Sequence, residues 1–372
     1  MDIGIPKESL AHEHRGALTP GGVKALTERG HRVYVETGAG AEAGHSDDDY
    51  RSAGAMIAYS RDEAVQRAEL LLGAQALRPA EYPLLRPGQT ILTFWMLPSA
   101  HAESLRTLVG TQVTAIGLEV IEDDEGNAPA LQAMSEMAGS LAVIVGAGLL
   151  LNEFGGKGIL LTGGPGVPPA NVVILGTGVL GQAAARAAVG LGAEVLLLDI
   201  SVTRLRQALD RLPRPVPTMV ARPLTIERAL AFADLVIAAP GVRGDRAPII
   251  VTRPMLRKMK PRSVIMDFAI DMGGCLETSR PTYFPQPTYE AEGILHFCVP
   301  NLPTIAARSA TQALTNTVLP WVIELAEKGI ERTLADNAAL QRGTYLYRGS
   351  CVKESLAELF GLKFEPLPFV WR

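Results

Sequence analysis

The sequence has few cysteines, no long apolar run and no excess of charge of either sign, and each shortage excludes a class of protein. Its three cysteines, Cys275, Cys298 and Cys351, are widely spaced and adjoin no metal-ligand pattern, which indicates reduced thiols in a cytoplasmic protein and no metal site. The longest apolar stretch, 141–151, is shorter than the roughly 20 residues that cross a bilayer, so we interpret it as a buried helix and expect no membrane partner. The strand-like segment 2–6 lacks the charged and apolar regions of a signal peptide.

Charge is nearly balanced, because 35 Lys and Arg residues stand against 39 Asp and Glu residues. No basic run is long enough to neutralise a phosphate backbone, so nucleic acid is not an expected partner. What the chain does have is apolar material, 47% of its 372 residues, which is enough for packed interiors throughout. Single cores stop growing near roughly 250 to 300 residues, so this length predicts two domains.

Strand-like and helical segments alternate along most of the chain, which predicts α/β layers. A helical segment at 134–154 leads into a glycine- and proline-rich stretch at 155–169, after which the alternation restarts. A later helix at 310–328 can return the chain to the first domain, which would make that domain discontinuous. The expected strands are 3–5, 33–35, 70–72, 91–94 and 113–116 before the loop, and 172–175, 195–198, 235–238 and 264–267 after it.

A G-x-G-x-x-G pattern lies between an apolar strand and an alanine-rich helix, the context that identifies a dinucleotide fold. The first glycine permits a tight turn, the second lets the backbone approach a pyrophosphate, and the third lets helix and strand pack closely, while the helix N-terminus offers N–H donors. The next strand ends at Asp199, whose carboxylate can accept both ribose hydroxyls and repel a 2′-phosphate, so NAD is predicted over NADP. Arg204 either stacks on adenine or is a solvated helix charge. The pattern consists of Gly176, Thr177, Gly178, Val179, Leu180 and Gly181.

Five separated motifs occur along the chain at 6–8 with 15–20, 134–139, 164–167, 267–275 and 313–316. In this order they resemble the motifs of the alanine dehydrogenase and pyridine nucleotide transhydrogenase α-subunit family, with details closer to alanine dehydrogenase. The resemblance implies an α/β fold with two Rossmann-like domains and an active site in the cleft between them. It implies an NAD-binding domain at 134–305, inserted in a discontinuous substrate domain at 1–133 and 306–372. It also implies a homo-oligomer, a hexamer or a dimer.

The resemblance assigns roles to individual residues. Arg15 matches an arginine that grips the substrate carboxylate, a task suited to a planar guanidinium. Asp271 matches an acid beside nicotinamide and substrate, and Ser135 matches a residue that contacts the cofactor phosphates. Asn301 and Leu302 match the segment that lines the nicotinamide pocket. Without the resemblance, these positions would be interpreted as an exposed arginine, a turn acid and a helix cap.

At two positions the sequence departs from the family. Gln75 occupies the place of a lysine that binds the keto acid, and Met96 occupies the place of a histidine that serves as general acid and base. Glutamine carries no charge and methionine transfers no proton, so both usual proton-handling groups are missing. Trp95 and Met96 would make a substrate pocket broader and more apolar, unless both are core residues.

The sequence therefore predicts an NAD-dependent amino-acid dehydrogenase or imine reductase that is inefficient on alanine and pyruvate. Arg15 and Asp271 are the candidate catalytic residues, with His296 and Tyr283 as weaker candidates. A protonated imine suits the departures, because it needs only hydride delivery beside an anchored carboxylate and a counter-charge. Two alternatives stay open: a catalytically decayed NAD-binding regulatory or structural protein, and a transhydrogenase-like hydride carrier.

Overall fold

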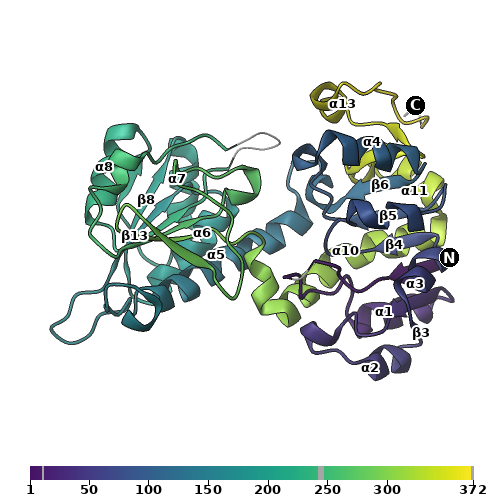
Figure 1. The fold of residues 1–372 in the computed structure, drawn as a ribbon, viewed down its shortest axis with the longest axis horizontal. Coiled ribbons are helices and arrows are strands. Elements are labelled where there is room, and N and C mark those ends of the chain that lie inside the picture. Colours follow the sequence, from purple (N-terminus) through teal and green to yellow (C-terminus); the bar gives the residue numbers. More distant parts are fainter. Residues whose placement is uncertain (11, 242–246, 370–372) are drawn as a thin grey trace. The chain divides into compact units, whose positions relative to one another are not determined.

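A computed structural model describes residues 1–10, 12–241 and 247–369 (Figure 1). The chain forms two compact α/β units, of which the first is discontinuous. Unit 1 comprises Met1–Met134 and Thr304–Arg372, and unit 2 comprises Ser135–Pro303. Each unit is built around a mostly parallel sheet, which confirms the predicted fold class.

The sheet of unit 1 has eight strands among the described residues, in the order β15-β14-β6-β5-β4-β1-β2-β3. The strands β1 to β6 pair in parallel, while β14 and β15 add an antiparallel edge. From β1 the chain first builds outward through β2 and β3 and then returns to build the other side from β4, so the switch point lies between β1 and β4. The strands are β1 (Asp2–Ile5), β2 (Arg32–Glu36), β3 (Met56–Ala58), β4 (Leu70–Leu72), β5 (Thr90–Thr93), β6 (Thr114–Gly117), β14 (Thr344–Tyr347) and β15 (Ser350–Cys351).

Helices α1 and α3 of unit 1 begin at residues whose side chains cap them. Thr19 accepts from the Gly22 N–H at the start of α1, and Ser60 accepts from the Glu63 N–H at the start of α3. Every residue of β4, β5 and β6 is buried, as expected for parallel strands covered on both faces. The helices are α1 (Pro20–Thr27), α2 (Asp47–Ser52), α3 (Arg61–Arg67), α4 (Ala102–Gly110), α10 (Ala307–Lys328), α11 (Ile330–Asp336), α12 (Ala338–Arg342) and α13 (Glu354–Phe360).

The sheet of unit 2 has seven strands among the described residues, in the order β12-β13-β11-β10-β7-β8-β9. Alternate residues of β7 enter different apolar clusters, Val172 and Ile174 on one face and Val173 and Leu175 on the other. The switch point lies between β7 and β10. The strands are β7 (Asn171–Leu175), β8 (Glu194–Asp199), β9 (Thr218–Val220), β10 (Leu235–Ala238), β11 (Val264–Asp267), β12 (Thr288–Ala291) and β13 (Ile294–Phe297), and the helices are α6 (Val179–Gly190), α7 (Val202–Asp210), α8 (Pro223–Phe232) and α9 (Arg253–Leu256).

Helix α5 (Pro129–Leu149) begins earlier than the predicted helix, because Pro129 suits its first turn. It is the single helix of the described chain that is long and apolar enough to cross a membrane, and 39% of its most apolar window is buried. The prediction of a fully buried helix was wrong on one face, because Ile144 is 60% exposed. On another face a Cβ on Gly139 would lie 2.2 Å from the Leu180 carbonyl oxygen of α6, so the two helices pack at backbone contact.

Candidate functional site

The glycine loop of unit 2 has the geometry that its spacing predicts. Gly176 has a φ of 98°, and a Cβ there would lie 2.3 Å from the Ala239 carbonyl oxygen. A Cβ on Gly181 would lie 1.9 Å from the Gly176 carbonyl oxygen, so this glycine is required for helix and strand to pack. A Cβ on Gly178 would meet nothing within 4 Å. The protein's own packing therefore requires Gly176 and Gly181, whereas Gly178 borders open space.

That open space lies at the N-terminus of α6. Gly178 is the N-cap residue, and no side chain caps the helix there, so the first N–H groups of α6 remain available to a ligand. Val179, at the first helical position, is 38% exposed, and Leu180 follows it. Donors at the positive end of a helix dipole suit a pyrophosphate, so these residues fit a dinucleotide.

Asp199 ends β8, as predicted, but its carboxylate is largely occupied by the protein itself. Oδ2 accepts from the Thr177 N–H at 2.7 Å and from Thr177 Oγ1 at 2.8 Å, and Oδ1 accepts from the Ser201 N–H at 2.8 Å. A carboxylate has roughly four acceptor positions, so one remains on Oδ1. The protein thus leaves about one acceptor position of Asp199 unused, and the binding of both ribose hydroxyls stays a prediction.

The other predicted cofactor residues lie around the same edge of unit 2. Ser135 is half-buried on α5, one helical turn before Gly139. Arg204 is exposed on α7. Asn301 has a left-handed φ of 51° in the segment after β13. Leu302 is 1% exposed and packs in an apolar core cluster, so its side chain stabilises the segment and only its backbone remains for a ligand.

Asp271 is exposed on a short 3-10 turn, Ile270–Met272, just after β11. The turn is held by Asp267, a residue to which the sequence analysis gave no role. Asp267 is 1% exposed and accepts from the Ala269 and Cys275 N–H groups, each at 2.9 Å, and from the Ser279 hydroxyl. The buried Asp267 is therefore a structural acid, and the role of Asp271 beside nicotinamide and substrate stays a prediction.

His296 is fully buried and its ring contacts are satisfied inside unit 2. Nδ1 lies 2.9 Å from the Ile294 carbonyl oxygen and must donate, so Nε2 accepts from Thr278 Oγ1 at 2.8 Å. The ring also stacks on Tyr289, and burial lowers the pKa of His296. These contacts fit a neutral structural histidine and not the catalytic candidate considered from the sequence. Tyr283, the other weak candidate, is 48% exposed.

In unit 1 the candidate substrate residues gather at the carboxyl edge of the sheet. Glu8 follows β1, Gln75 follows β4, Met96 follows β5 and Glu119 follows β6. These four strands are parallel, so their carboxyl ends meet at one edge, where open α/β sheets bind ligands.

Arg15 is a buried residue in this unit, and the interpretation as an exposed arginine is wrong. Its Nε and Nη2 donate to Glu13 Oε1 and Oε2, both at 2.7 Å, and each side chain is 2% exposed. The Gln75 side chain also hydrogen-bonds to Glu13. Burial raises the pKa of Glu13, but the charge and hydrogen bonds of Arg15 more than offset it, so the pKa lies below its usual value and the pair is ionised. Arg15 also lies 5.7 Å from the Phe94 ring centroid.

Glu8 is a second acid beside this pair, and sequence reasoning gave it no role. Its Oε1 accepts from the Ala74 N–H at 2.6 Å, next to Gln75. Burial, followed by repulsion from Glu13, raises the pKa of Glu8 to about 8. The raised pKa favours the protonated form of Glu8, which has no charge to add to the ion pair of Glu13 and Arg15.

Glu119 holds the backbone that carries Met96. Its Oε1 accepts from the Met96 N–H at 2.6 Å and from the Tyr345 hydroxyl at 2.9 Å, and Oε2 accepts from the Trp95 N–H at 3.1 Å. Met96 adopts a left-handed φ of 49° and is 36% exposed. Trp95 is 3% exposed and packs in the core, with its Nε1 donating to the Ile91 carbonyl oxygen at 3.3 Å. The structure corrects the expectation for Trp95, whose ring belongs to the core and does not widen a pocket.

Together, two Rossmann-like units, a complete glycine loop and a buried charge cluster define a two-domain protein of the dinucleotide-binding class. The family models named alanine dehydrogenase/PNT N-terminal domain and alanine dehydrogenase/PNT C-terminal domain match residues 4–138 and 142–354. The chain belongs to the alanine dehydrogenase/PNT family, as the sequence motifs predicted, and is an NAD-dependent oxidoreductase of that family.

Individual relatives are similar in sequence to this protein over nearly the whole chain. Alanine dehydrogenase from Halomonas elongata is 44% identical over 98% of both chains, and that from Bacillus subtilis is 43% identical over 98% of this chain and 96% of the relative. A solved L-alanine dehydrogenase superposes with a TM-score of 0.92 at 42% identity, covering 97% of this chain and 99% of that one. A transhydrogenase from Sinorhizobium meliloti, 23% identical over 95% of this chain and 100% of that one, shares the fold with a TM-score of 0.80.

Proposed function

We propose that the protein transfers hydride at the carbon bearing nitrogen of an amino acid, or of an imine derived from one, and that alanine and pyruvate are poor substrates. The observation that carries the proposal is the pair Gln75 and Met96 at the carboxyl edge of unit 1, where the family resemblance calls for lysine and histidine. The nicotinamide cofactor supplies or accepts the hydride.

Arg15 is the anchor for the substrate carboxylate. Its bonds to Glu13 use Nε and one N–H of Nη2, so the Nη1 donors are the ones that serve a substrate. Glu13 fixes the guanidinium plane before the substrate arrives, which lowers the entropy cost of binding. Asp271 supplies a negative charge to a protonated nitrogen, and Asn301 lines the nicotinamide pocket.

An imine substrate fits this set of residues better than a keto acid with ammonia does. Forming an imine from a keto acid requires proton transfers to and from nitrogen and oxygen, and a positioned acid or base is typically worth about 100-fold to 10,000-fold in such steps. Gln75 offers neutral hydrogen bonds and Met96 offers no proton. A preformed protonated imine needs only orientation and hydride delivery.

Alanine dehydrogenase activity itself is the second candidate, favoured by the 44% and 43% identities to proteins of that name. A single screen separates the two candidates. Oxidation of NADH is measured with pyruvate and ammonium, with larger keto acids and ammonium, and with cyclic imines that carry a carboxylate. Faster turnover on an imine or a larger substrate supports the proposal, whereas a preference for pyruvate and ammonium supports the second candidate.

We also propose a homo-oligomer, a hexamer or a dimer, located in the cytoplasm. Unit 2 exposes several large apolar side chains that a copy of the chain would cover, and all three cysteines are free and buried, as in a reducing compartment. The exposed side chains are Ile144, Phe154, Leu160 and Val167. Light scattering after gel filtration tests the oligomer, and a monomeric mass would contradict it.

A further inference from the structure

We propose that the Glu8 carboxyl group is the acid and base of the substrate site, and that it donates a proton to the substrate nitrogen or oxygen in place of the absent lysine and histidine. The inference deepens the proposed function and rests on it. Four observations support it. Glu8 follows β1 at the switch point of the sheet, and hydrogen bonds hold its neighbouring residues. The charges around it favour its neutral form, and a buried hydroxyl without a partner lines the adjoining pocket.

Glu8 lies at the switch point of unit 1. It follows β1, and its Oε1 accepts from the Ala74 N–H of the segment that follows β4, so the carboxyl group bridges the two loops between which the strand order reverses. Open α/β sheets bind their ligands in the crevice at this point. The glycine loop lies at the corresponding place in unit 2, between β7 and β10.

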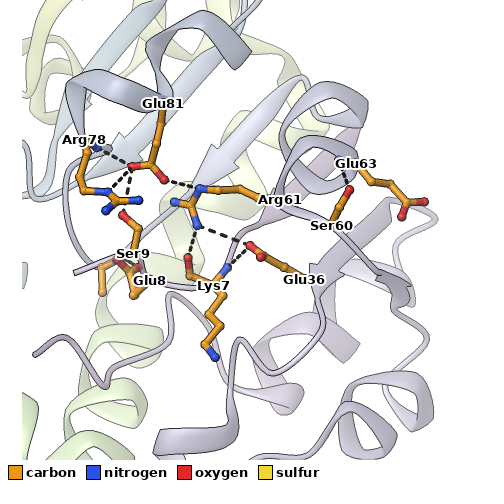
Figure 2. Close-up of polar contacts among 10 residues, drawn as sticks. Lys7, Glu8, Ser9, Glu36, Ser60, Arg61, Glu63, Arg78 and Glu81 are labelled. Atoms are coloured by element: carbon orange, nitrogen blue, oxygen red, sulfur yellow. Dashed lines mark hydrogen bonds and ion pairs between the residues drawn. The ribbon is translucent and has the colours of Figure 1, made fainter. Parts of the chain in front are cut away.

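Hydrogen bonds hold the residues on both sides of Glu8, through the backbone of Lys7 and the side chain of Ser9 (Figure 2). The Lys7 N–H donates to Glu36 Oε2 at 2.7 Å, and the Lys7 carbonyl oxygen accepts from Arg61. On the other side, Ser9 Oγ donates to Glu81 Oε2 at 3.0 Å. Glu8 therefore projects from a segment fixed at the preceding and the following residue, which a positioned proton donor requires.

The charges facing Glu8 favour its neutral form. Glu13 repels the ionised carboxylate, while Arg15 and Arg61 attract it. Arg15 is paired with Glu13, and Arg61 contacts Glu81 and lies 3.5 Å from Glu36 Oε2, so both cations are already balanced by other acids. Because Gln75 stands in place of a lysine, no cation without its own acid faces Glu8. The charge of an ionised Glu8 would therefore not be balanced, and the neutral, protonated form is favoured.

A small pocket adjoins the carboxyl group and is lined by Glu8, Gln75 and Thr93, among others. Thr93 is 1% exposed, and its Oγ1 is buried without a hydrogen-bond partner in the described structure. A buried hydroxyl normally finds a partner, and the pocket, about 10 Å³ in volume, has room for one water-sized group beside it. Because Ala74 occupies Glu8 Oε1, Oε2 is the oxygen that carries the proton toward such a group.

For an imine that arrives unprotonated, Glu8 supplies the proton that the nitrogen needs. The proton leaves Glu8 Oε2 and forms an N–H bond to the substrate nitrogen, with the C=N π electrons providing the electron pair. The carbon takes the hydride that the nicotinamide cofactor supplies. Glu8 is left as a carboxylate and takes a proton from water before the next cycle. In the oxidative direction the same carboxylate removes the proton.

The first test uses binding and needs no turnover. Oxamate, an unreactive analogue of a 2-keto acid, is titrated into the NADH-loaded protein by calorimetry at about pH 8.5, in buffers of different ionisation enthalpy. An anion beside Glu8 favours its protonation, so we expect proton uptake by the native protein and none by Glu8→Gln. Gln75→Lys should also abolish the uptake. Equal uptake by native protein and Glu8→Gln would overturn the inference.

The second test uses the substrate found in the screen. Glu8→Gln should lower kcat by about 100-fold or more with little change in KM, and should remove the fall in rate as pH rises through about 8. Glu8→Asp should recover part of the rate, and the matched control Glu63→Gln, on α3, should match the native protein. An unchanged kcat and pH profile in Glu8→Gln would overturn the inference. If no amino acid or imine turns over, the proposed function fails, and the oxamate titration still decides the part played by Glu8.

Discussion

The two sheets use their carboxyl edges in different ways. In unit 2 the edge is built from backbone: Gly176 and Gly181 allow the turn, and the N-terminus of α6 offers N–H donors. In unit 1 the edge is built from side chains, with the buried pair of Glu13 and Arg15 beside the half-buried Glu8. The cofactor site thus depends on the absence of side chains, whereas the substrate site depends on their charges. Substitutions should therefore damage the two units in distinguishable ways.

The largest effect is expected from Gly181→Ala. The added Cβ would lie 1.9 Å from the Gly176 carbonyl oxygen, so α6 must move away from β7 and NADH binding should be lost together with several kcal/mol of stability. Gly178→Ala is the matched control, because its Cβ meets nothing in the protein. It should keep the Tm and weaken NADH binding by 10-fold or more, roughly 1.4 kcal/mol. Thermal unfolding and calorimetric titration measure both, and normal NADH affinity in Gly181→Ala would refute the role of this loop.

The next effect is expected in unit 1 from Arg15→Ala. Removing the guanidinium leaves Glu13 buried without its counter-charge, which should cost about 3–5 kcal/mol of unfolding free energy. Arg15→Lys keeps the positive charge but loses the paired N–H donors of the guanidinium. It should therefore cost less stability and still raise the KM for substrate several-fold. Urea unfolding and steady-state kinetics provide the values. A native KM in Arg15→Lys would show that Arg15 supports Glu13 and does not bind the substrate.

Glu8→Gln should make the protein more stable relative to the native chain as pH rises. The pKa of Glu8 is raised from 4.5 to about 8, so its stabilising contribution is present below 4.5 and is lost between 4.5 and 8, where the unfolded chain ionises and the folded one does not. The loss is about 1.4 kcal/mol per pH unit across that window. Unfolding free energies at about pH 5 and about pH 8.5 should show Glu8→Gln gaining up to a few kcal/mol. Parallel pH profiles for the two proteins would mean that Glu8 titrates normally.

A small effect is expected from Thr177→Ala in unit 2. It removes the Oγ1 bond to Asp199 Oδ2 and keeps the backbone N–H bond, so NADH binding and stability should each change by about 1 kcal/mol. Asp199→Ala removes all three bonds and should cost more. Titration with NADH and NADPH measures the outcome, and a gain in NADPH affinity is expected only for Asp199→Ala. Equal losses of NADH affinity in Thr177→Ala and Asp199→Ala would mean that the Thr177 hydroxyl accounts for the whole contribution of Asp199.

The sequence predicted unit 2 better than unit 1 for a physical reason. The glycine loop and Asp199 lie in one short segment, and the glycines at positions 176 and 181 directly indicate that no side chain fits there. The Glu8 cluster joins segments after β1 and β4 with residues 13–15, and no local pattern indicates that such acids meet. The short strand β9 was missed because its three residues are only partly buried, and β14 was missed because its partner β6 lies far away in the sequence.

The central claim is that unit 2 retains the family's cofactor site while unit 1 has lost the family's usual proton-handling groups. The most direct measurement is the turnover of pyruvate, ammonium and NADH by the native protein and by the double variant Gln75→Lys/Met96→His. We expect the native protein to bind NADH and turn over far below about 10 per second, the median for enzymes, and the double variant to be markedly faster. A native turnover above about 10 per second, with no gain in the double variant, would contradict the account.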